Sequence, residues 1–238
     1  MRHRLSKSRF VAGWKCPRFL WWRVHRPDAP QMQPSVAAQD RMEQGNEVGY
    51  LATQHFTGGV LIDFERDRMQ EMVDATRTAL AEGAPAIFEA AFFEDDVFVA
   101  VDVLERLDEG FRVIEVKSSS SVKEEHIPDV AIQVHVLRKA GLDIREAALM
   151  HLNKAYRVGG QEDLFVQDDV LAEVEAVLPD VPGLIREYQA VLDGPDPGAC
   201  LGDQCARDWE CPLERACWPQ EADHVRRLRG IGPKRALK

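Results

Sequence analysis

Runs of apolar residues in the middle of the chain predict β-strands. Three stretches of mainly β-branched, aromatic and alanine residues follow one another at 86–93, 97–104 and 111–117, a composition typical of buried strands. The polar segment 105–110 between the second and third stretches ends in Gly110, as hairpin loops often do. The pattern therefore predicts three consecutive strands, of which the last two form a hairpin.

A helix and a fourth strand are predicted next. Apolar residues recur at helical spacing from Ile127 to Leu137, and Gly141 suits the end of a helix. The apolar segment 147–152 predicts the strand. The order strand, strand, strand, helix, strand predicts an α/β fold with a central sheet flanked by helices. Further helices are expected at 37–53, 65–82, 171–178 and 184–192.

Charged side chains interrupt the predicted strands at positions that would lie close together. Glu115 and Lys117 are two residues apart, so they point to the same side of their strand. Asp102 lies near the end of the preceding strand, and Glu89 is the one carboxylate within the strand before that. Converging carboxylates can bind Mg²⁺ or Mn²⁺, with Lys117 orienting an activated water or neutralising a transition state. The alternative for Glu115 and Lys117 is an ion pair at a strand end.

The predicted helix offers two more polar side chains to the same place. Asp129 and Gln133 are four residues apart, so they share one stripe of the helix. That stripe could face the carboxylates of the strands.

Five cysteines indicate a metal-binding segment. Cys16 lies near the start, and Cys200, Cys205, Cys211 and Cys217 lie late in the chain. The sequence shows neither a signal-peptide pattern nor an apolar run that could span a membrane, so we expect a cytoplasmic protein, where clustered cysteines usually bind metal. The late cysteines lack the Cys-x-x-Cys pairs of zinc sites. Their spacing is better suited to an iron–sulfur cluster, with zinc as the less favoured occupant.

Charge is distributed unevenly along the chain. The formal net charge is −10, from 30 basic and 40 acidic residues. Residues 1–26 contain eight Lys/Arg and residues 225–238 contain six, and neither segment contains an acid, so the rest carries a net charge of −24. Two basic ends held together by a cluster could follow a phosphate backbone, with Trp14, Trp21 and Trp22 stacking on bases. Core packing is the alternative for each tryptophan. The candidate DNA-binding residues are Arg9, Lys15, Arg18, Arg226, Arg227 and Arg229.

These motifs together resemble the PD-(D/E)XK nuclease superfamily, and within it the RecB-like branch that includes the CRISPR-adaptation exonucleases and other iron–sulfur exonucleases. The match covers roughly residues 5–220 and consists of Asp102, Glu115-x-Lys117 and Gln133, with Glu89 upstream. The resemblance implies a restriction-endonuclease-like core with a mixed central sheet. It also implies that Asp102 and Glu115, with Glu89, bind the catalytic metal, that Lys117 assists the water and that Gln133 braces the site.

The resemblance further implies a [4Fe–4S] cluster bound by Cys16, Cys205, Cys211 and Cys217, with Cys200 as a possible replacement for Cys205. Two positions depart from the pattern of the superfamily. Gly49 stands where many relatives carry a metal-binding histidine, and Leu137 stands where many carry a tyrosine. The first departure leaves open whether the site holds one or two metal ions.

The expected organisation is a nuclease core at 37–194 and an iron–sulfur subdomain made from 1–36 and 195–220. The basic tail 221–238 resembles the start of a helix-hairpin-helix, in which a Gly-Ile-Gly turn presents N–H groups to a DNA phosphate. We therefore expect the chain to be a fragment of a longer protein, with a flexible tail as the alternative.

The expected function is a metal-dependent DNA exonuclease that acts on single strands or ends in repair or defence. A DNA-binding module that cleaves poorly is the alternative suggested by the missing histidine, and a structural zinc protein is the third.

Overall fold

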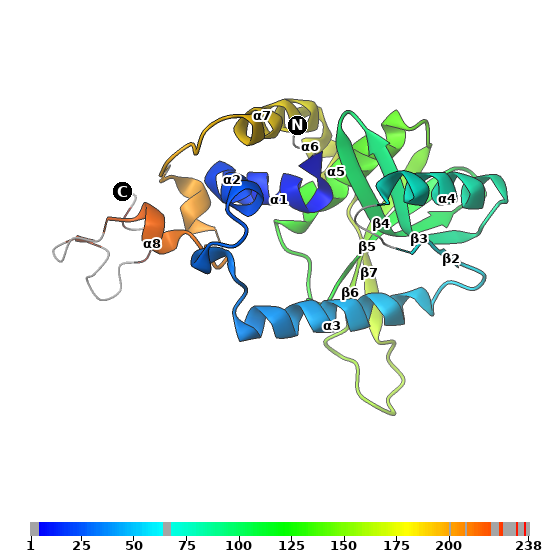
Figure 1. Ribbon diagram of the computed structural model, residues 1–238. Coiled ribbons are helices and arrows are strands. Elements are labelled where there is room, and N and C mark those ends of the chain that lie inside the picture. Colours follow the sequence, from blue (N-terminus) through cyan, green and yellow to red (C-terminus); the bar gives the residue numbers. More distant parts are fainter. Residues whose placement is uncertain are drawn as a thin grey trace.

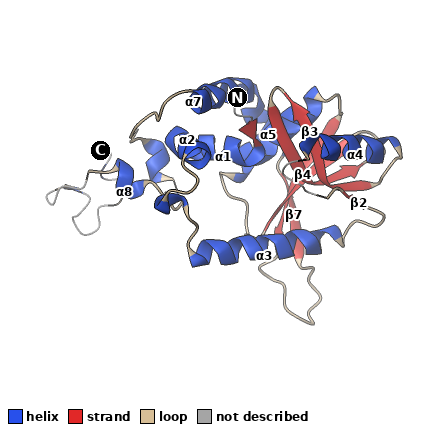
Figure 2. Cartoon of the chain, viewed as in Figure 1, coloured by secondary structure: helices blue, strands red, loops and turns tan. Residues whose placement is uncertain are grey.

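The structure has a mixed β-sheet at its centre with helices against both faces (Figures 1 and 2). This computed structural model describes residues 5–63, 68–199, 201–207, 209–219, 224–225, 232 and 236. The strands are β1 (Leu5–Ser6), β2 (Val60–Leu61), β3 (Ala86–Glu94), β4 (Val97–Arg106), β5 (Phe111–Lys117), β6 (Ile144–Leu152) and β7 (Phe165–Asp169).

The seven strands form a single sheet. Six of them lie in the order β2-β3-β4-β5-β6-β7. β3, β4 and β5 form an antiparallel meander, β6 is parallel to β5, and β7 is antiparallel to β6. β2 is parallel to β3, and β1 is parallel to β4. The sheet is therefore mixed, as expected from the sequence.

The helices form layers on the two faces of the sheet (Figure 1). α5 packs between the sheet and the helices α1, α6 and α7, which is why it is apolar on nearly every side. On the other face, Val48 and Ala52 of α3 pack against Ile114 of β5 and Met150 of β6. The helices are α1 (Lys7–Lys15), α2 (Pro17–His25), α3 (Val36–Thr53), α4 (Met69–Ala81), α5 (His126–Lys139), α6 (Leu171–Val177), α7 (Val181–Asp193) and α8 (Glu214–Cys217), with short 3₁₀ helices at Pro30–Met32, Leu178–Asp180 and Asp203–Ala206.

The predicted fold class is confirmed in its main feature, a mixed α/β sheet flanked by helices. The four predicted strands correspond to β3, β4, β5 and β6, and the helix predicted between the last two strands is α5. β1, β2 and β7 lie where no strand was predicted. β1 and β2 have only two residues each, too few for an alternating pattern, and β7 carries mostly exposed side chains.

The N-terminal segment belongs to the main hydrophobic core. Leu5, Phe10 and Leu20 are fully buried in the same cluster as the strands of the sheet, and α2 packs against α7. The division expected at residue 36 stays a prediction. Within the described ranges, each helix is too short or too polar to cross a membrane.

The hairpin between β4 and β5 depends on the absence of a side chain at Gly110. Gly110 has a φ of +77°, and a Cβ there would lie 2.5 Å from the carbonyl oxygen of Asp143. Gly83, after α4, has a φ of +78°, but a Cβ there would meet no atom within 4 Å.

We predict that Gly110→Ala is more destabilising than Gly83→Ala. Gly83→Ala should lower the free energy of unfolding by about 1–2 kcal/mol, since it incurs only the left-handed backbone penalty. Gly110→Ala adds overpacking against the backbone and should cost roughly 2–5 kcal/mol. Urea denaturation of the two variants measures both values, and equal losses would contradict the prediction.

Candidate active site

The candidate site lies where β4 and β5 separate. β4 pairs with β1 at 97–98 and with β5 at 103–106, which leaves a gap between these two partners. Asp102 falls in this gap, and the antiparallel register puts Glu115 opposite it. The backbone N–H of Val116 donates to Asp102 Oδ2 at 2.8 Å instead of continuing the ladder. Asp102 and Glu115 therefore face each other at the point where the pairing of β4 with β5 stops.

α5 closes the site from the side. Lys117 Nζ donates to Glu115 Oε1 at 2.5 Å and to Asp129 Oδ2 at 2.6 Å. Gln133 Nε2 donates to Glu115 Oε2 at 2.7 Å. The predicted stripe of Asp129 and Gln133 therefore faces the carboxylates of the strands.

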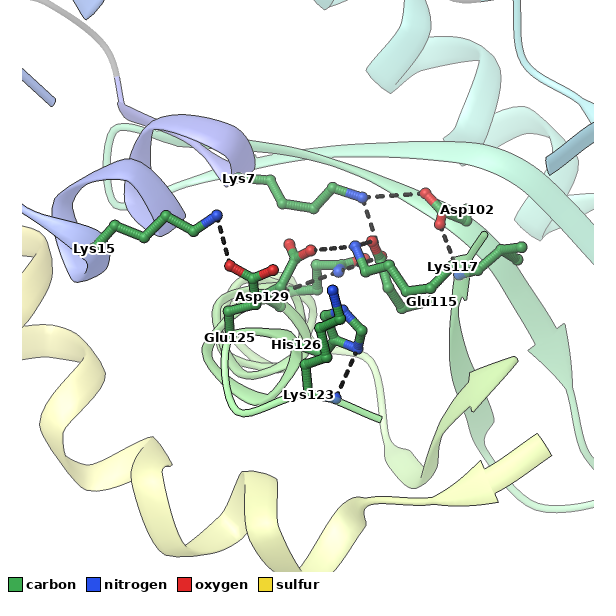
Figure 3. Close-up of polar contacts among 11 residues, drawn as sticks. Lys7, Lys15, Asp102, Glu115, Lys117, Lys123, Glu125, His126 and Asp129 are labelled. Carbon is green, nitrogen blue, oxygen red and sulfur yellow. Dashed lines mark hydrogen bonds and ion pairs between the residues drawn. The ribbon is translucent and has the colours of Figure 1, made fainter. Parts of the chain in front are cut away.

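Lys7 completes the cluster and was not predicted as a site residue. Its Nζ lies 3.1 Å from both Asp102 Oδ1 and Glu115 Oε2 (Figure 3). Lys7 is the first residue of α1 and follows β1 directly, so the pairing of β1 beside the gap brings it to the site. Because 95 residues separate it from Asp102, no local pattern could have revealed this contact.

Glu89 occupies a strained position on β3. It lies between two regular pairs of β3 with β4, opposite Asp102, and its φ of 55° is unusual for a residue with a side chain. Burial, followed by the proximity of Asp102, raises the pKa of Glu89 to about 7. The strain and the raised pKa both indicate that the fold tolerates this carboxyl group at a cost, as is common at functional sites.

The charges in the site perturb one another strongly. Burial opposes ionisation of Glu115, but Lys117 and Lys7 outweigh it and hold the pKa of Glu115 well below its usual range. Burial and the charge on Glu115 raise the pKa of Asp102, and they raise that of Asp129 to about 6. Burial disfavours the ammonium of Lys117, but the carboxylates keep its pKa above the ordinary value. The carboxylates around Lys117 therefore favour its protonated form in the metal-free protein.

Two acceptor atoms in the site lack partners. Asp129 Oδ1 and Gln133 Oε1 are buried without a hydrogen-bond partner among the described residues. Reversing the amide of Gln133 would place its oxygen against Glu115, so the amide orientation is determined by that carboxylate. Buried acceptors normally have a donor or a cation beside them, so these oxygens suit an added cation or water.

The overall charge of the cluster also suits a divalent cation. Four carboxyl groups, those of Glu89, Asp102, Glu115 and Asp129, face two ammonium groups, those of Lys7 and Lys117, so the fully ionised set carries a formal charge of −2. In the described part of the chain, no three His, Cys, Asp or Glu side chains are arranged to hold a metal ion. Mg²⁺ needs fewer protein ligands, because it commonly uses one or two carboxylates with waters and phosphate oxygens. The residues therefore fit such an ion.

His126 is a second residue near the site that was not predicted. It is buried at the start of α5, and its Nδ1 accepts the backbone N–H of Lys123 at 3.2 Å. Burial, and then the charge of Lys117, lower the pKa of His126 to about 4. His126 is therefore neutral at physiological pH, with Nε2 as its protonated nitrogen.

The described cysteines come from both ends of the chain, and among the described residues no three of them are arranged to hold a metal ion. Cys16 lies at the junction of α1 and α2 and is 8% exposed. Burial raises the pKa of Cys211 to about 11, and nearby Cys16, Cys217 and Cys205 contribute to this rise. These four are the predicted cluster ligands. Cys200 lies outside the described residues.

The basic residues predicted to contact DNA are partly engaged within the protein. Lys15 Nζ lies 2.6 Å from Glu125 Oε2 (Figure 3), and Arg18 Nε lies 3.1 Å from Asp196 Oδ1. Arg9 is partly buried on α1. Their role in DNA binding stays a prediction. The predictions for Arg226, Arg227 and Arg229 concern residues outside the described part of the chain, as does most of the tail that resembles a helix-hairpin-helix.

The three N-terminal tryptophans make packing contacts. Trp22 is 6% exposed and donates to Asp196 Oδ2 at 3.0 Å. Trp21 donates to a backbone carbonyl at 2.9 Å, and the guanidinium of Arg207 lies 4.1 Å from the ring centre of Trp14. These contacts favour the packing alternative over base stacking, most clearly for the buried Trp22.

Comparisons with known proteins give weak likenesses only. No protein-family model and no curated protein matches the chain. Among solved structures, it is similar to the alkaline exonuclease LHK-Exo from Laribacter hongkongensis at 11% identity and a TM-score of 0.34, covering 80% of this chain and 90% of that one. The structure of LHK-Exo in complex with dAMP is similar at 12% identity and a TM-score of 0.30, covering 79% of this chain and 91% of that one. The structure of SSO0001 is similar at 13% identity and a TM-score of 0.30, covering 76% of this chain and 75% of that one. Values this low do not assign a family.

We predict that Glu89→Gln stabilises the metal-free protein more at pH 8 than at pH 5. An acid whose pKa is raised on folding contributes stability below its unfolded pKa of about 4.5, and that contribution is lost as pH rises through about 7. The amide avoids this loss, so the difference in unfolding free energy between variant and wild type should grow with pH, by at most about 3 kcal/mol. Urea titrations in EDTA measure it, and a constant or shrinking difference would contradict the assigned environment.

Proposed function

We propose that this protein is a metal-dependent DNA nuclease of the PD-(D/E)XK type, in the RecB-like iron–sulfur branch. The observation that carries the proposal is the convergence of Asp102, Glu115, Lys117 and Gln133 at the gap between β4 and β5. The proposed reaction is hydrolysis of phosphodiester bonds in single-stranded DNA or at DNA ends, in the cytoplasm and in repair or defence.

Each side chain has a role in this proposal. Asp102 and Glu115 would hold Mg²⁺ or Mn²⁺, with Glu89 as a further carboxylate beside them. When bound, the ion activates a water and offsets charge on the scissile phosphate. Lys117 would assist the water as a hydrogen-bond donor and a positive charge beside the scissile phosphate. Gln133 orients Glu115 by its hydrogen bond at 2.7 Å.

The proposed iron–sulfur cluster would join the two ends of the chain. Cys16, Cys205, Cys211 and Cys217 supply the four thiolates that a [4Fe–4S] cluster takes, one for each iron. The proximity that lets Cys16, Cys217 and Cys205 add to the effect of burial in raising the pKa of Cys211 supports this set, although Cys16 comes from the start of the chain and the other three follow β7. Arg18 Nη1 donates to Cys217 Sγ at 3.1 Å, and such donors stabilise thiolates. Zinc remains the less favoured occupant.

A DNA-binding module with weak cleavage is the second candidate. It is favoured by one observation, the contact of Lys7 with both Asp102 and Glu115. A cation supplied by the chain reduces the need of these carboxylates for a metal. The same fold could then bind DNA through its basic ends without efficient hydrolysis.

We predict that Asp102→Asn, Glu115→Gln and Lys117→Met each lower Mn²⁺-dependent degradation of single-stranded DNA by roughly 100-fold or more, because each removes a charge beside the scissile phosphate. Glu105→Gln is the matched control, since Glu105 lies on β4 three residues from Asp102 but pairs with Arg112 at 3.2 Å. Release of acid-soluble nucleotides gives the rates. If the wild-type protein releases nucleotides no faster than a sample without enzyme, the DNA-binding module is favoured. Full activity in the three variants would refute the assignment of these residues to the active site.

We predict that anaerobically purified protein is brown and contains about four iron atoms per chain. Cys16→Ser, Cys211→Ser and Cys217→Ser should each bleach it, whereas Cys200→Ser should change little. Iron and zinc analysis with absorption spectra between 300 and 500 nm provides the measurement. A colourless protein with about one zinc would replace the cluster by a structural zinc site.

A further inference from the structure

Lys7 occupies the position that a metal ion would take between Asp102 and Glu115. Its Nζ is 3.1 Å from one oxygen of each carboxylate (Figure 3). A Mg²⁺ ion bound to the same two oxygens would lie about 2.1 Å from each. Two cations so close would repel each other strongly in a partly buried site. The ion and the ammonium group therefore cannot share this position.

Lys7 differs from the other donors in the cluster because it reaches the carboxylates from α1, outside β5 and α5, although the side chains of Lys7 and Lys117 are similarly exposed, at 20% and 23%. Val116 donates to Asp102 from the backbone of β5, so that donor cannot move without the strand. Lys117 is two residues from Glu115 on the same strand, and Gln133 is fully buried on α5. Lys7 reaches the site from α1 on a four-carbon side chain that is 20% exposed. A rotamer change would move its ammonium away from the carboxylates.

The backbone of α1 is held at both ends, so such a change would involve the side chain rather than the helix. At the start, β1 pairs with β4, and Ser6 Oγ caps the helix by accepting the N–H of Arg9 at 3.3 Å. At the other end, Lys15 forms an ion pair with Glu125, the residue before α5, at 2.6 Å. The backbone position of Lys7 is therefore fixed, and only its side chain would move.

We propose that Lys7 is a built-in counter-ion that neutralises Asp102 and Glu115 in the metal-free protein and is displaced when a divalent metal binds. The inference rests on the proposed function, since it concerns the same carboxylates. Lys7 is a positioning residue in this view, because it keeps two repelling carboxylates together until the metal arrives. Its presence stabilises the metal-free fold and weakens metal affinity, and both effects are measurable without an activity assay.

Isothermal titration with Mn²⁺ on the full chain tests the proposal, with thermal melts of each variant in EDTA and in Mn²⁺. Lys7→Met should lower the Kd for Mn²⁺ by on the order of tenfold, as expected when a competing interaction is removed. The variant should melt below wild type in EDTA and gain more from Mn²⁺. Lys139→Met is the matched control, since Lys139 lies at the end of α5 beside Asp95, with a largely exposed side chain outside the carboxylate cluster. Its Kd should equal that of wild type.

Lys7→Gln is the second variant, because its amide can keep one hydrogen bond to a carboxylate without the charge. Folding of Lys7→Met or Lys7→Gln only after Mn²⁺ is added would support the proposal, since the metal would then replace the counter-ion. Failure of both to fold with Mn²⁺ present, as judged by circular dichroism, would overturn it. An unchanged or raised Kd in folded Lys7 variants would also overturn it, as would equal tightening in Lys139→Met. Absence of Mn²⁺ binding in wild type and all variants would instead refute the proposed metal-dependent function.

Discussion

Repulsion among buried carboxylates is the constraint on which the rest of this structure depends. Glu115 is 2% exposed and Asp129 is 7% exposed, and burial and the charge on Glu115 raise the pKa of both Asp102 and Glu89. Unpaired charges at this depth would destabilise the fold by several kcal/mol each. The chain compensates with Lys117 from β5 and Lys7 from α1. Among the described residues, two buried acceptors of the site have no hydrogen-bond partner, and together with the formal charge of −2 they are compatible with an added divalent cation.

The N-terminal helix connects this carboxylate cluster with the cysteines. α1 has nine residues, so it spans about 13 Å. Lys7 at its start contacts Asp102 and Glu115, and Cys16 directly after its end lies near Cys211. A cluster bound by the cysteines would therefore hold the segment that delivers Lys7. The N-terminal segment is also buried in the main hydrophobic core through Leu5, Phe10 and Leu20.

Two features of Glu89 are unfavourable for folding. Glu89 adopts a left-handed backbone conformation within a strand and keeps a carboxyl group with a pKa of about 7 in a partly buried place. Neither feature helps the sheet to form, and both are costly. Two basic residues, by contrast, stabilise the fold. Lys15 and Arg18 form ion pairs with carboxylates within the protein. Any contact of these two residues with DNA would have to compete with those ion pairs.

The sequence by itself determined the central strands, α5 and the group formed by Asp102, Glu115, Lys117 and Gln133. These positions follow from short-range rules, because side chains two apart share a strand face, hairpin register places neighbours opposite, and residues four apart share a helix stripe. Only the tertiary structure decided that Lys7 enters the site, that β1 fills the edge of β4 beside the gap, and that Arg18 contacts Asp196. These contacts join residues roughly 90 to 180 positions apart. They leave no periodic signal, because they arise from packing of the whole chain rather than from local backbone geometry.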